Sequence, residues 1–205
     1  MITLADVDSL DWEKSGGLMP AIIQDERTLQ VLMLGYMNPA ALRATLETGW
    51  TTFYSRTRKS LWRKGETSGN RLRLKSVRRD CDKDALLVSA APEGPTCHLG
   101  STSCFSGQDA PGLGWLARLE DVILSRKEED GSSSYTAGLF AEGPARIAKK
   151  VGEEGVETAL AGASGELNEL NEEAADLLFH LLLLLAARNS SLAQVVNVLR
   201  ARRDG

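Results

Sequence analysis

Two sets of potential metal ligands lie together in residues 80–104 of the sequence. They are the thiols of Cys81, Cys97 and Cys104 and the carboxylates of Asp80, Asp82 and Asp84. Zinc prefers thiolate and imidazole ligands, and three protein ligands leave a position open for a water whose pKa the metal lowers to about 7. Carboxylate oxygens instead suit Mg²⁺. The residue types therefore predict a zinc and a magnesium site, with a polar turn and buried free cysteines as the alternative.

The spacing of this cluster also predicts how its side chains are arranged. Alternate residues of a strand face one side, so a strand through residues 80–84 would place the aspartates on one face and Cys81 on the other. His98 directly follows Cys97. That position leaves three roles open for the imidazole, as a fourth metal ligand, a proton shuttle or a structural group.

A basic segment precedes the metal-ligand cluster. Between Tyr54 and Arg79 there are ten lysines and arginines and one acidic residue, Glu66. Glycines let a ligand approach the backbone, and hydroxyl groups beside cations suit phosphate. The candidate substrate-binding residues are Arg56, Trp62, Lys64, Gly65, Thr67 and Ser68. RNA binding and a solvated basic face are the alternatives, and the net charge of −4 argues against a general nucleic-acid binder.

The second half of the sequence contains acidic residues at helical spacing. They are Glu153, Glu154, Glu157, Glu173 and Asp176. Residues three and four apart share a helix face, so two facing helices would bring these carboxylates together. Such a cluster needs a cation, and Mg²⁺ commonly bridges carboxylates and phosphates. Lys149 and Lys150 lie one turn earlier and could meet the same phosphates. A solvated acidic face is the alternative.

The elements that must position these residues fall into two predicted domains, 1–110 and 111–205. A segment rich in glycine and small residues, 106–114, separates them, and the two parts carry charges of about +1 and −5. The chain of 205 residues is 42% apolar and 25% charged, which is typical of globular proteins and excludes global disorder.

Local patterns predict an α+β first domain, mostly of antiparallel strands, and an all-α second domain. The predicted strands are 21–24 and 30–34, forming a hairpin, then 50–56, 71–77 and 85–90. Asn38 and Pro39 begin a helix that ends near Gly49. The predicted helices of the second domain are 113–129, 144–163, 167–187 and 191–203, arranged as a bundle. Ser191 and Gln194 have the spacing of a capping box.

Composition also predicts where the protein works. The most apolar stretch, residues 177–187, is shorter than the roughly 20 residues of a membrane span. The first residues are acidic, whereas a secretory signal begins with basic ones. We therefore expect a cytoplasmic protein without a membrane partner and with cysteines that form no disulfides.

The two halves resemble two enzyme families of histidine biosynthesis. The first half resembles phosphoribosyl-AMP cyclohydrolase at residues 32–38, 61–69, 80–84, 94–98 and 103–105. The second resembles phosphoribosyl-ATP pyrophosphohydrolase, an all-helical nucleotide pyrophosphatase, at residues 134–136, 146–158 and 173–180. Their order is that of the bifunctional fusion that performs consecutive steps of the pathway.

This resemblance implies roles for the matching residues. Zinc would be bound by Cys81, Cys97 and Cys104, with Cys81 contributed across the interface of a homodimer. Mg²⁺ would be bound by Asp80, Asp82 and Asp84, and in the second domain by Glu153, Glu154, Glu157, Glu173 and Asp176. His98 would transfer protons, and Glu154 is the candidate catalytic glutamate of the second domain.

The implied reactions are two hydrolyses. The second domain would convert phosphoribosyl-ATP to phosphoribosyl-AMP and pyrophosphate, and the first would open the adenine ring at N1–C6 with zinc-activated water. Two other classes remain. One is a general nucleotide pyrophosphatase with an inactive first domain, and the other is a zinc-stabilised RNA-binding module with a helical dimerisation domain.

Overall fold

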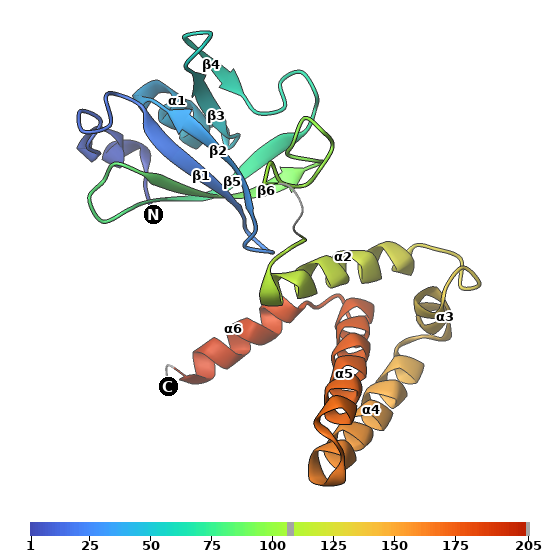
Figure 1. The fold of residues 1–205 in the computed structure, drawn as a ribbon. Coiled ribbons are helices and arrows are strands. Elements are labelled where there is room, and N and C mark those ends of the chain that lie inside the picture. The colour runs from blue at the N-terminus through green and yellow to red at the C-terminus, as the bar shows by residue number, and fades with distance from the viewer. Residues whose placement is uncertain (106–108, 204–205) are drawn as a thin grey trace. The chain divides into compact units, whose positions relative to one another are not determined.

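The chain forms two compact units, Met1–Trp115 and Leu116–Gly205 (Figure 1). The computed structural model describes residues 1–105 and 109–203 and, for Ser164, only the backbone. The division follows the predicted linker 106–114, of which residues 106–108 lie outside the described part. Each unit has its own hydrophobic core.

A four-stranded mixed sheet forms the centre of the first unit. Its strands are β1 (Met19–Asp25), β2 (Val31–Met37), β5 (Arg71–Arg79) and β6 (Leu86–Glu93), in the order β2-β1-β6-β5. The β1–β2 and β5–β6 pairs are antiparallel, as predicted, whereas β1 and β6 are parallel. Because β1 and β6 run in the same direction, the end of β6 lies beside the end of β1, where Ala90 pairs with Asp25.

Local signals account for the first hairpin and the helix that follows it. Met19 pairs with Met37, and the side chain of Asp25 accepts the backbone N–H groups of Arg27 and Thr28 at 2.8 and 2.9 Å, which closes the turn. Helix α1 (Pro39–Thr48) begins at Asn38, whose Oδ1 accepts the N–H of Ala41 at 2.8 Å. Gly49, with φ +72°, ends it.

A second, two-stranded sheet follows α1. It pairs β3 (Thr52–Ser55) with β4 (Ser60–Arg63). β3 is shorter than the predicted strand 50–56, and β4 was not predicted because its four residues lie in the basic segment without apolar alternation. α1 and β3 pack against β2, and the 3₁₀ helix η1 (Leu4–Ser9) packs against α1. The core of this unit contains Val7, Met19, Leu42 and Phe53.

Residues 80–85 form a loop between β5 and β6, in agreement with the predicted strands 71–77 and 85–90, so the strand geometry considered for the three aspartates does not occur. β5 ends at Arg79. The carboxylate of Asp80 then accepts the backbone N–H groups of Asp84 and Ala85 at 3.1 and 3.2 Å. Lys83 has φ +66°, outside the range of a strand. Aspartate side chains compete for backbone donors in this way, which favours a turn over a continued strand.

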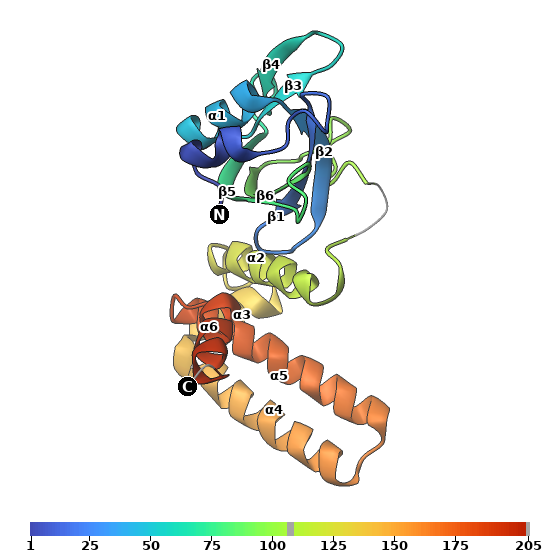
Figure 2. The ribbon, with the colours of Figure 1, turned by 90° about the vertical axis from the view of Figure 1, so that its left-hand side faces the viewer.

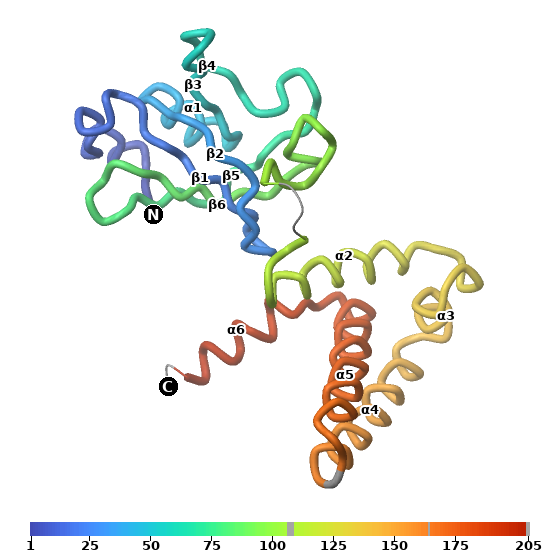
Figure 3. The backbone as a smooth tube through the Cα atoms, in the orientation of Figure 1, coloured from blue at the N-terminus to red at the C-terminus, as the bar shows by residue number. Residues whose placement is uncertain are grey.

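The second unit is helical. Its helices are α2 (Trp115–Lys127), α3 (Tyr135–Glu142), α4 (Pro144–Ser164), α5 (Leu167–Ala187) and α6 (Leu192–Arg203), preceded by the 3₁₀ turn η2 (Gly112–Gly114). α4 and α5 form an antiparallel hairpin, seen side by side in Figures 2 and 3. Buried Ile123, Leu139, Ile147 and Leu183 pack where α2, α3, α4 and α5 meet.

The prediction for the helical unit missed α3. This helix has eight residues, contains Gly138 and lies between Gly131 and Gly143, and glycines at this spacing are typical of a loop. It forms because the Ser134 side chain accepts the N–H of Ala137 at 3.2 Å and because Leu139 is buried. The predicted capping box of α6 is confirmed, since Ser191 N–H donates to Gln194 Oε1 at 3.0 Å and Gln194 N–H donates back to Ser191 Oγ.

In the described part of the chain, no single helix has the length and apolar character to cross a membrane, although α5 and α6 together, bent by 101°, meet that test of length and composition. The three cysteines are free thiols.

Candidate active sites

The loop after β6 brings two of the three cysteines together. Cys97 lies in a tight turn in which its N–H donates to Ser101 O at 2.9 Å. Cys104 is tied to β2, because its N–H donates to Leu32 O at 2.7 Å. The hydroxyl of Ser103 also donates to β2, at Val31 O. These bonds place the two thiols close enough for each to shift the pKa of the other.

The two thiols differ electrostatically. The N–H of Leu99, 3.5 Å from Cys97 Sγ, lowers the pKa of the Cys97 thiol, and the Ser101 hydroxyl, Cys104 and the nearby Lys64 ammonium lower it further. Burial raises the pKa of the Cys104 thiol, and the Cys97 thiol beside it raises it further. A pair of thiols with one already favoured as thiolate fits the soft donor set of zinc.

Cys81 does not join this pair within one chain. Across the described residues, the groups of three or more potential ligands within 4.8 Å of one another are carboxylate groups, and neither contains a cysteine. Cys81 is exposed on the loop 80–85, where its Sγ lies 3.9 Å from Asp82 Oδ1. Among the described residues, Cys81 is therefore not gathered with Cys97 and Cys104 into one group of potential ligands.

His98 lies beside the cysteine pair on the solvent side. Its Nδ1 is 3.9 Å from Cys97 Sγ, and its side chain is exposed. An exposed imidazole 3.9 Å from Cys97 Sγ is in reach both of solvent and of a molecule bound at the two cysteines, so it is a candidate for proton transfer.

The structure divides the candidate substrate-binding residues into two kinds. The guanidinium of Arg56 stacks on the Tyr36 ring at 3.9 Å, and Trp62 packs on Phe53 with ring centroids 5.0 Å apart. These two are partly engaged within the fold, whereas Thr67 is exposed.

The turn after β4 carries the remaining substrate-binding candidates. Gly65 has φ +80°, and a Cβ there would overlap the backbone of Asn70, so this position requires glycine. Ser68 Oγ accepts the N–H of Asn70 at 3.3 Å, and Lys64 Nζ donates to Asn70 O at 3.4 Å. The turn thus holds Lys64 close to the cysteine pair, where its charge acts on Cys97.

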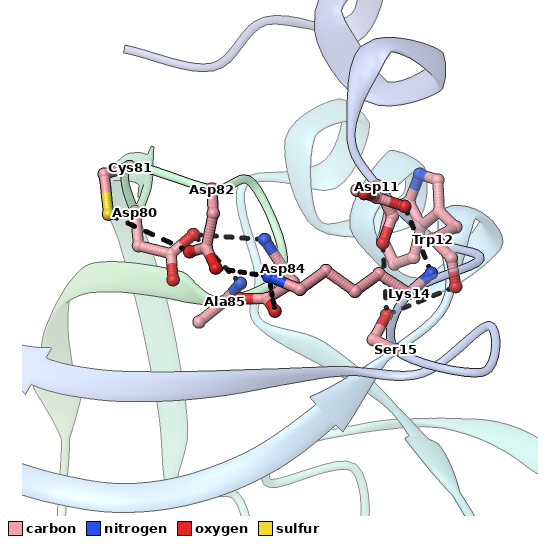
Figure 4. A network of polar contacts seen from close by, with 9 residues as sticks. All are labelled: Asp11, Trp12, Lys14, Ser15, Asp80, Cys81, Asp82, Asp84 and Ala85. Atoms are coloured by element: carbon pink, nitrogen blue, oxygen red, sulfur yellow. Dashed lines mark hydrogen bonds and ion pairs between the residues drawn. The ribbon is translucent and has the colours of Figure 1, made fainter.

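The loop 80–85 gathers the three aspartates and holds an ammonium group. Asp80, Asp82 and Asp84 each offer an oxygen within 4.8 Å of the others. Lys14, which the sequence analysis did not single out, pairs with Asp82 and lies 2.7 Å from Asp84 Oδ2 (Figure 4). Lys14 lowers the pKa of Asp82, and its own pKa is raised. The aspartate oxygens already hold one cation, the ammonium of Lys14, and oxygen donors of this kind also fit Mg²⁺.

In the helical unit, α4 and α5 bring three glutamates together. Glu154 and Glu157 of α4 and Glu173 of α5 offer oxygens within 4.8 Å of one another. Burial raises the pKa of Glu173, and the charges of Glu157, Glu154 and Asp176 raise it further. Three carboxylates gathered in this way, with the ionisation of Glu173 disfavoured, have the oxygen donors that suit a divalent cation.

The other predicted members of this cluster lie at its edge. Glu153 faces the lysines, with its Oε2 3.0 Å from Lys150 Nζ and its Oε1 3.5 Å from Lys149 Nζ. Asp176 is exposed and acts on Glu173 by charge, but it does not share the 4.8 Å group. Lys150 also lies 2.9 Å from Glu154 Oε1, and this contact lowers the pKa of Glu154.

Sequence reasoning missed a buried pair that supports Glu154. His180 Nδ1 lies 2.9 Å from the backbone oxygen of Asp176, which can only accept, so Nδ1 carries the proton. His180 Nε2 then accepts from the hydroxyl of Tyr135, 3.0 Å away. The same Nδ1 is 3.6 Å from Glu154 Oε1, and both His180 and Glu154 are buried. Tyr135 and His180 both lie in segments that match the family, but their contact spans 45 positions.

Replacing Tyr135 with phenylalanine tests this pair. The change leaves His180 Nε2 without its donor, which should cost about 1 kcal/mol and lower the melting temperature of the helical unit by about 4–8 °C. Loosening His180 beside Glu154 should also reduce pyrophosphate release several-fold. Thermal unfolding and a pyrophosphate assay measure both, with Tyr54→Phe in the first unit as control. Unchanged melting and unchanged pyrophosphate release would show that the hydroxyl does not hold the imidazole.

Comparison with known proteins follows the same division. The family described as phosphoribosyl-AMP cyclohydrolase matches residues 33–106, and the family described as phosphoribosyl-ATP pyrophosphohydrolase matches residues 116–203. The chain is similar to proteins named histidine biosynthesis bifunctional protein HisIE. It is 54% identical to the one from Escherichia coli (strain K12) and 53% identical to the one from Salmonella typhimurium, over 204 residues and 100% of each chain. It is 52% identical to the one from Vibrio cholerae over 197 residues, 95% of this chain and 94% of that one.

Proposed function

The chain belongs to the family of bifunctional histidine-biosynthesis enzymes, and we propose that it opens the purine ring of phosphoribosyl-AMP at the cysteine pair and hydrolyses phosphoribosyl-ATP at the glutamate cluster. The family carries both activities in one chain. What is proposed is the assignment of each reaction to residues, the metals and the order of events.

One observation carries this proposal. Each unit gathers its own set of metal-ligand groups, Cys97 with Cys104 from one loop in the first and Glu154, Glu157 and Glu173 from two helices in the second. A lysine lies beside each set, Lys64 near the thiols and Lys150 beside Glu154. Metal ligands next to cations suit a phosphate-bearing substrate.

In the helical unit the glutamates would hold Mg²⁺, which would neutralise charge on the triphosphate. Lys149 and Lys150 lie at the edge of the cluster and contact Glu153. They would release Glu153 and bind the phosphates in its place. A glutamate would orient a water molecule, and the buried Glu154 is the candidate for this role. The water attacks between the α and β phosphates and breaks the bond that joins them. Pyrophosphate leaves and phosphoribosyl-AMP remains. Positioning and charge stabilisation contribute most to such reactions.

In the first unit the thiols of Cys97 and Cys104 would hold zinc, which as a Lewis acid lowers the pKa of a water to about 7. Lys64 and the glycine turn beside it would bind the substrate phosphates and keep C6 of the purine over the thiols. Water adds at C6, and the N1–C6 bond breaks. His98, exposed beside Cys97, takes a proton from the water and returns it to N1.

We further propose that Cys81 completes the zinc site from a second copy of the chain. Its thiol is exposed and separate from the Cys97–Cys104 pair of its own chain, so a homodimer can supply it in trans. Thiolate ligands must remain reduced, which is consistent with the cytoplasm. The aspartates on the same loop would hold Mg²⁺ next to this interface.

Product identification tests the whole proposal. Purified protein with bound zinc is given phosphoribosyl-ATP and Mg²⁺, and the products are identified by mass. Pyrophosphate together with the ring-opened aminoimidazole carboxamide ribotide is the expected result. Accumulation of phosphoribosyl-AMP would refute the cysteine-site assignment, and unchanged substrate with folded, metal-loaded protein would refute both assignments and favour RNA binding.

A further inference from the structure

We propose that Lys14 is a built-in cation of the loop 80–85, which occupies the place of the divalent metal and must be displaced when that metal binds. This inference rests on the proposed function, because it takes the aspartates of the loop as the Mg²⁺ ligands. Lys14 is not itself a metal ligand, but it would control how tightly the aspartates of the loop bind their metal.

The first argument is the position of the ammonium. Lys14 Nζ contacts Asp82 and lies 2.7 Å from Asp84 Oδ2 (Figure 4). The oxygens of Asp80, Asp82 and Asp84 lie within 4.8 Å of one another, and Mg²⁺ bonds to oxygen at about 2.1 Å. A space of that size holds one cation. The ammonium and a metal ion bound by the same oxygens therefore exclude each other.

The second argument is that the backbone of Lys14 is held against the loop independently of its ion pairs. The N–H of Asp11 donates to Lys83 O at 3.0 Å, which joins the N-terminal segment to the loop. The N–H of Lys14 donates to Asp11 Oδ1 at 3.1 Å, and the Trp12 indole donates to Val7 O at 2.7 Å. Lys14 and Asp82 are 68 positions apart in sequence, so these bonds fix the approach of the lysine.

The third argument is that the contact can be reversed. The side chains of Lys14, Asp82 and Asp84 are 45%, 55% and 27% exposed. Ion pairs exposed to this degree are weak, and a released ammonium is readily hydrated. Asp80 is already committed to the backbone of the loop, which keeps its shape with either cation. The loop, with the exposed Cys81 on it, can therefore exchange the ammonium for a metal ion without refolding.

Binding of Mn²⁺, a spectroscopic substitute for Mg²⁺, tests the competition directly. The full-length protein is loaded with zinc and carries Glu157→Gln and Glu173→Gln, which silence the helical cluster. Free Mn²⁺ is measured by electron paramagnetic resonance. Lys14→Met, which keeps approximately the length of the side chain, should tighten binding about two- to fivefold. Lys14→Arg should bind like the parent, and Lys83→Met, which removes a charge from the same loop, should tighten binding by less than Lys14→Met.

Asp84→Asn in the same background distinguishes the two possible failures. If it weakens Mn²⁺ binding but Lys14→Met does not tighten it, the competition is refuted and the aspartate site stands. If Asp84→Asn leaves binding unchanged, the aspartate loop is not the metal site, and both the inference and that part of the proposed function are refuted. A melting curve of each metal-free variant verifies that it is folded.

Discussion

Serine in place of Cys97 is expected to abolish ring opening and to spare pyrophosphate release. Cys97 is buried, the N–H of Leu99 favours its thiolate, and the neighbouring Cys104 also lowers the pKa of its thiol. A serine hydroxyl stays protonated and is a poor zinc ligand. Loss of groups that merely support metal ligands costs 10–100-fold, so loss of the ligand itself should reduce ring opening by at least about a hundredfold.

The measurement gives phosphoribosyl-AMP and phosphoribosyl-ATP separately to the Cys97→Ser protein and quantifies each product, together with bound zinc by elemental analysis. Zinc content should fall with ring opening. Full ring opening with zinc retained would show that Cys97 is not a ligand. Loss of both activities in well-folded protein would refute the assignment of one reaction to each unit.

Glutamine in place of Glu154 is expected to have the reverse effect. Glu154 is the buried member of the glutamate cluster, and its Oε1 lies 2.9 Å from Lys150 Nζ and 3.6 Å from His180 Nδ1. The amide keeps the shape but removes the charge that a divalent cation requires. Lys150 keeps its contact with Glu153, so the helix should remain folded. Pyrophosphate release should fall by at least about a hundredfold.

A matched control is available on α5. Glu172→Gln removes the same charge from an exposed side chain next to Glu173 and should leave pyrophosphate release unchanged. Ring opening of supplied phosphoribosyl-AMP should be normal in both variants. Equal losses in Glu154→Gln and Glu172→Gln would mean that general acidity, and not the buried carboxylate, accounts for the effect.

The elements that the sequence predicted well are those with a complete local signal. The first hairpin has a turn whose Asp25 closes it, and α1 has both Asn38 at its start and Gly49 at its end. The shared face expected for the aspartates of the loop 80–85 assumed strand geometry, because their alternation imitates a strand face. The competing signal was that an aspartate can bind its own backbone, and at Asp80 that interaction prevails.

The candidate sites were predictable in residue type but not in their supporting contacts. The acidic residues of α4 and α5 follow helical spacing, and three of the five predicted carboxylates lie together, those of Glu154, Glu157 and Glu173. Lys14, Tyr135 and His180 carry no local signal for their roles, since their partners are 68 and 45 positions away. Glu153 was assigned to the cluster by spacing alone, and its two lysine partners turn it toward the edge.

The separate cores of the two units have a consequence for how this protein tolerates change. Val7, Met19 and Phe53 belong to one core and Ile123, Leu139 and Leu183 to the other. Most substitutions destabilise, and a protein tolerates them until a threshold is crossed. Here each unit has its own core and its own margin of folding stability, so a mutation that unfolds one unit need not destabilise the other. Under selection, one catalytic step can drift, improve or fail while its neighbour on the same chain is still inherited intact.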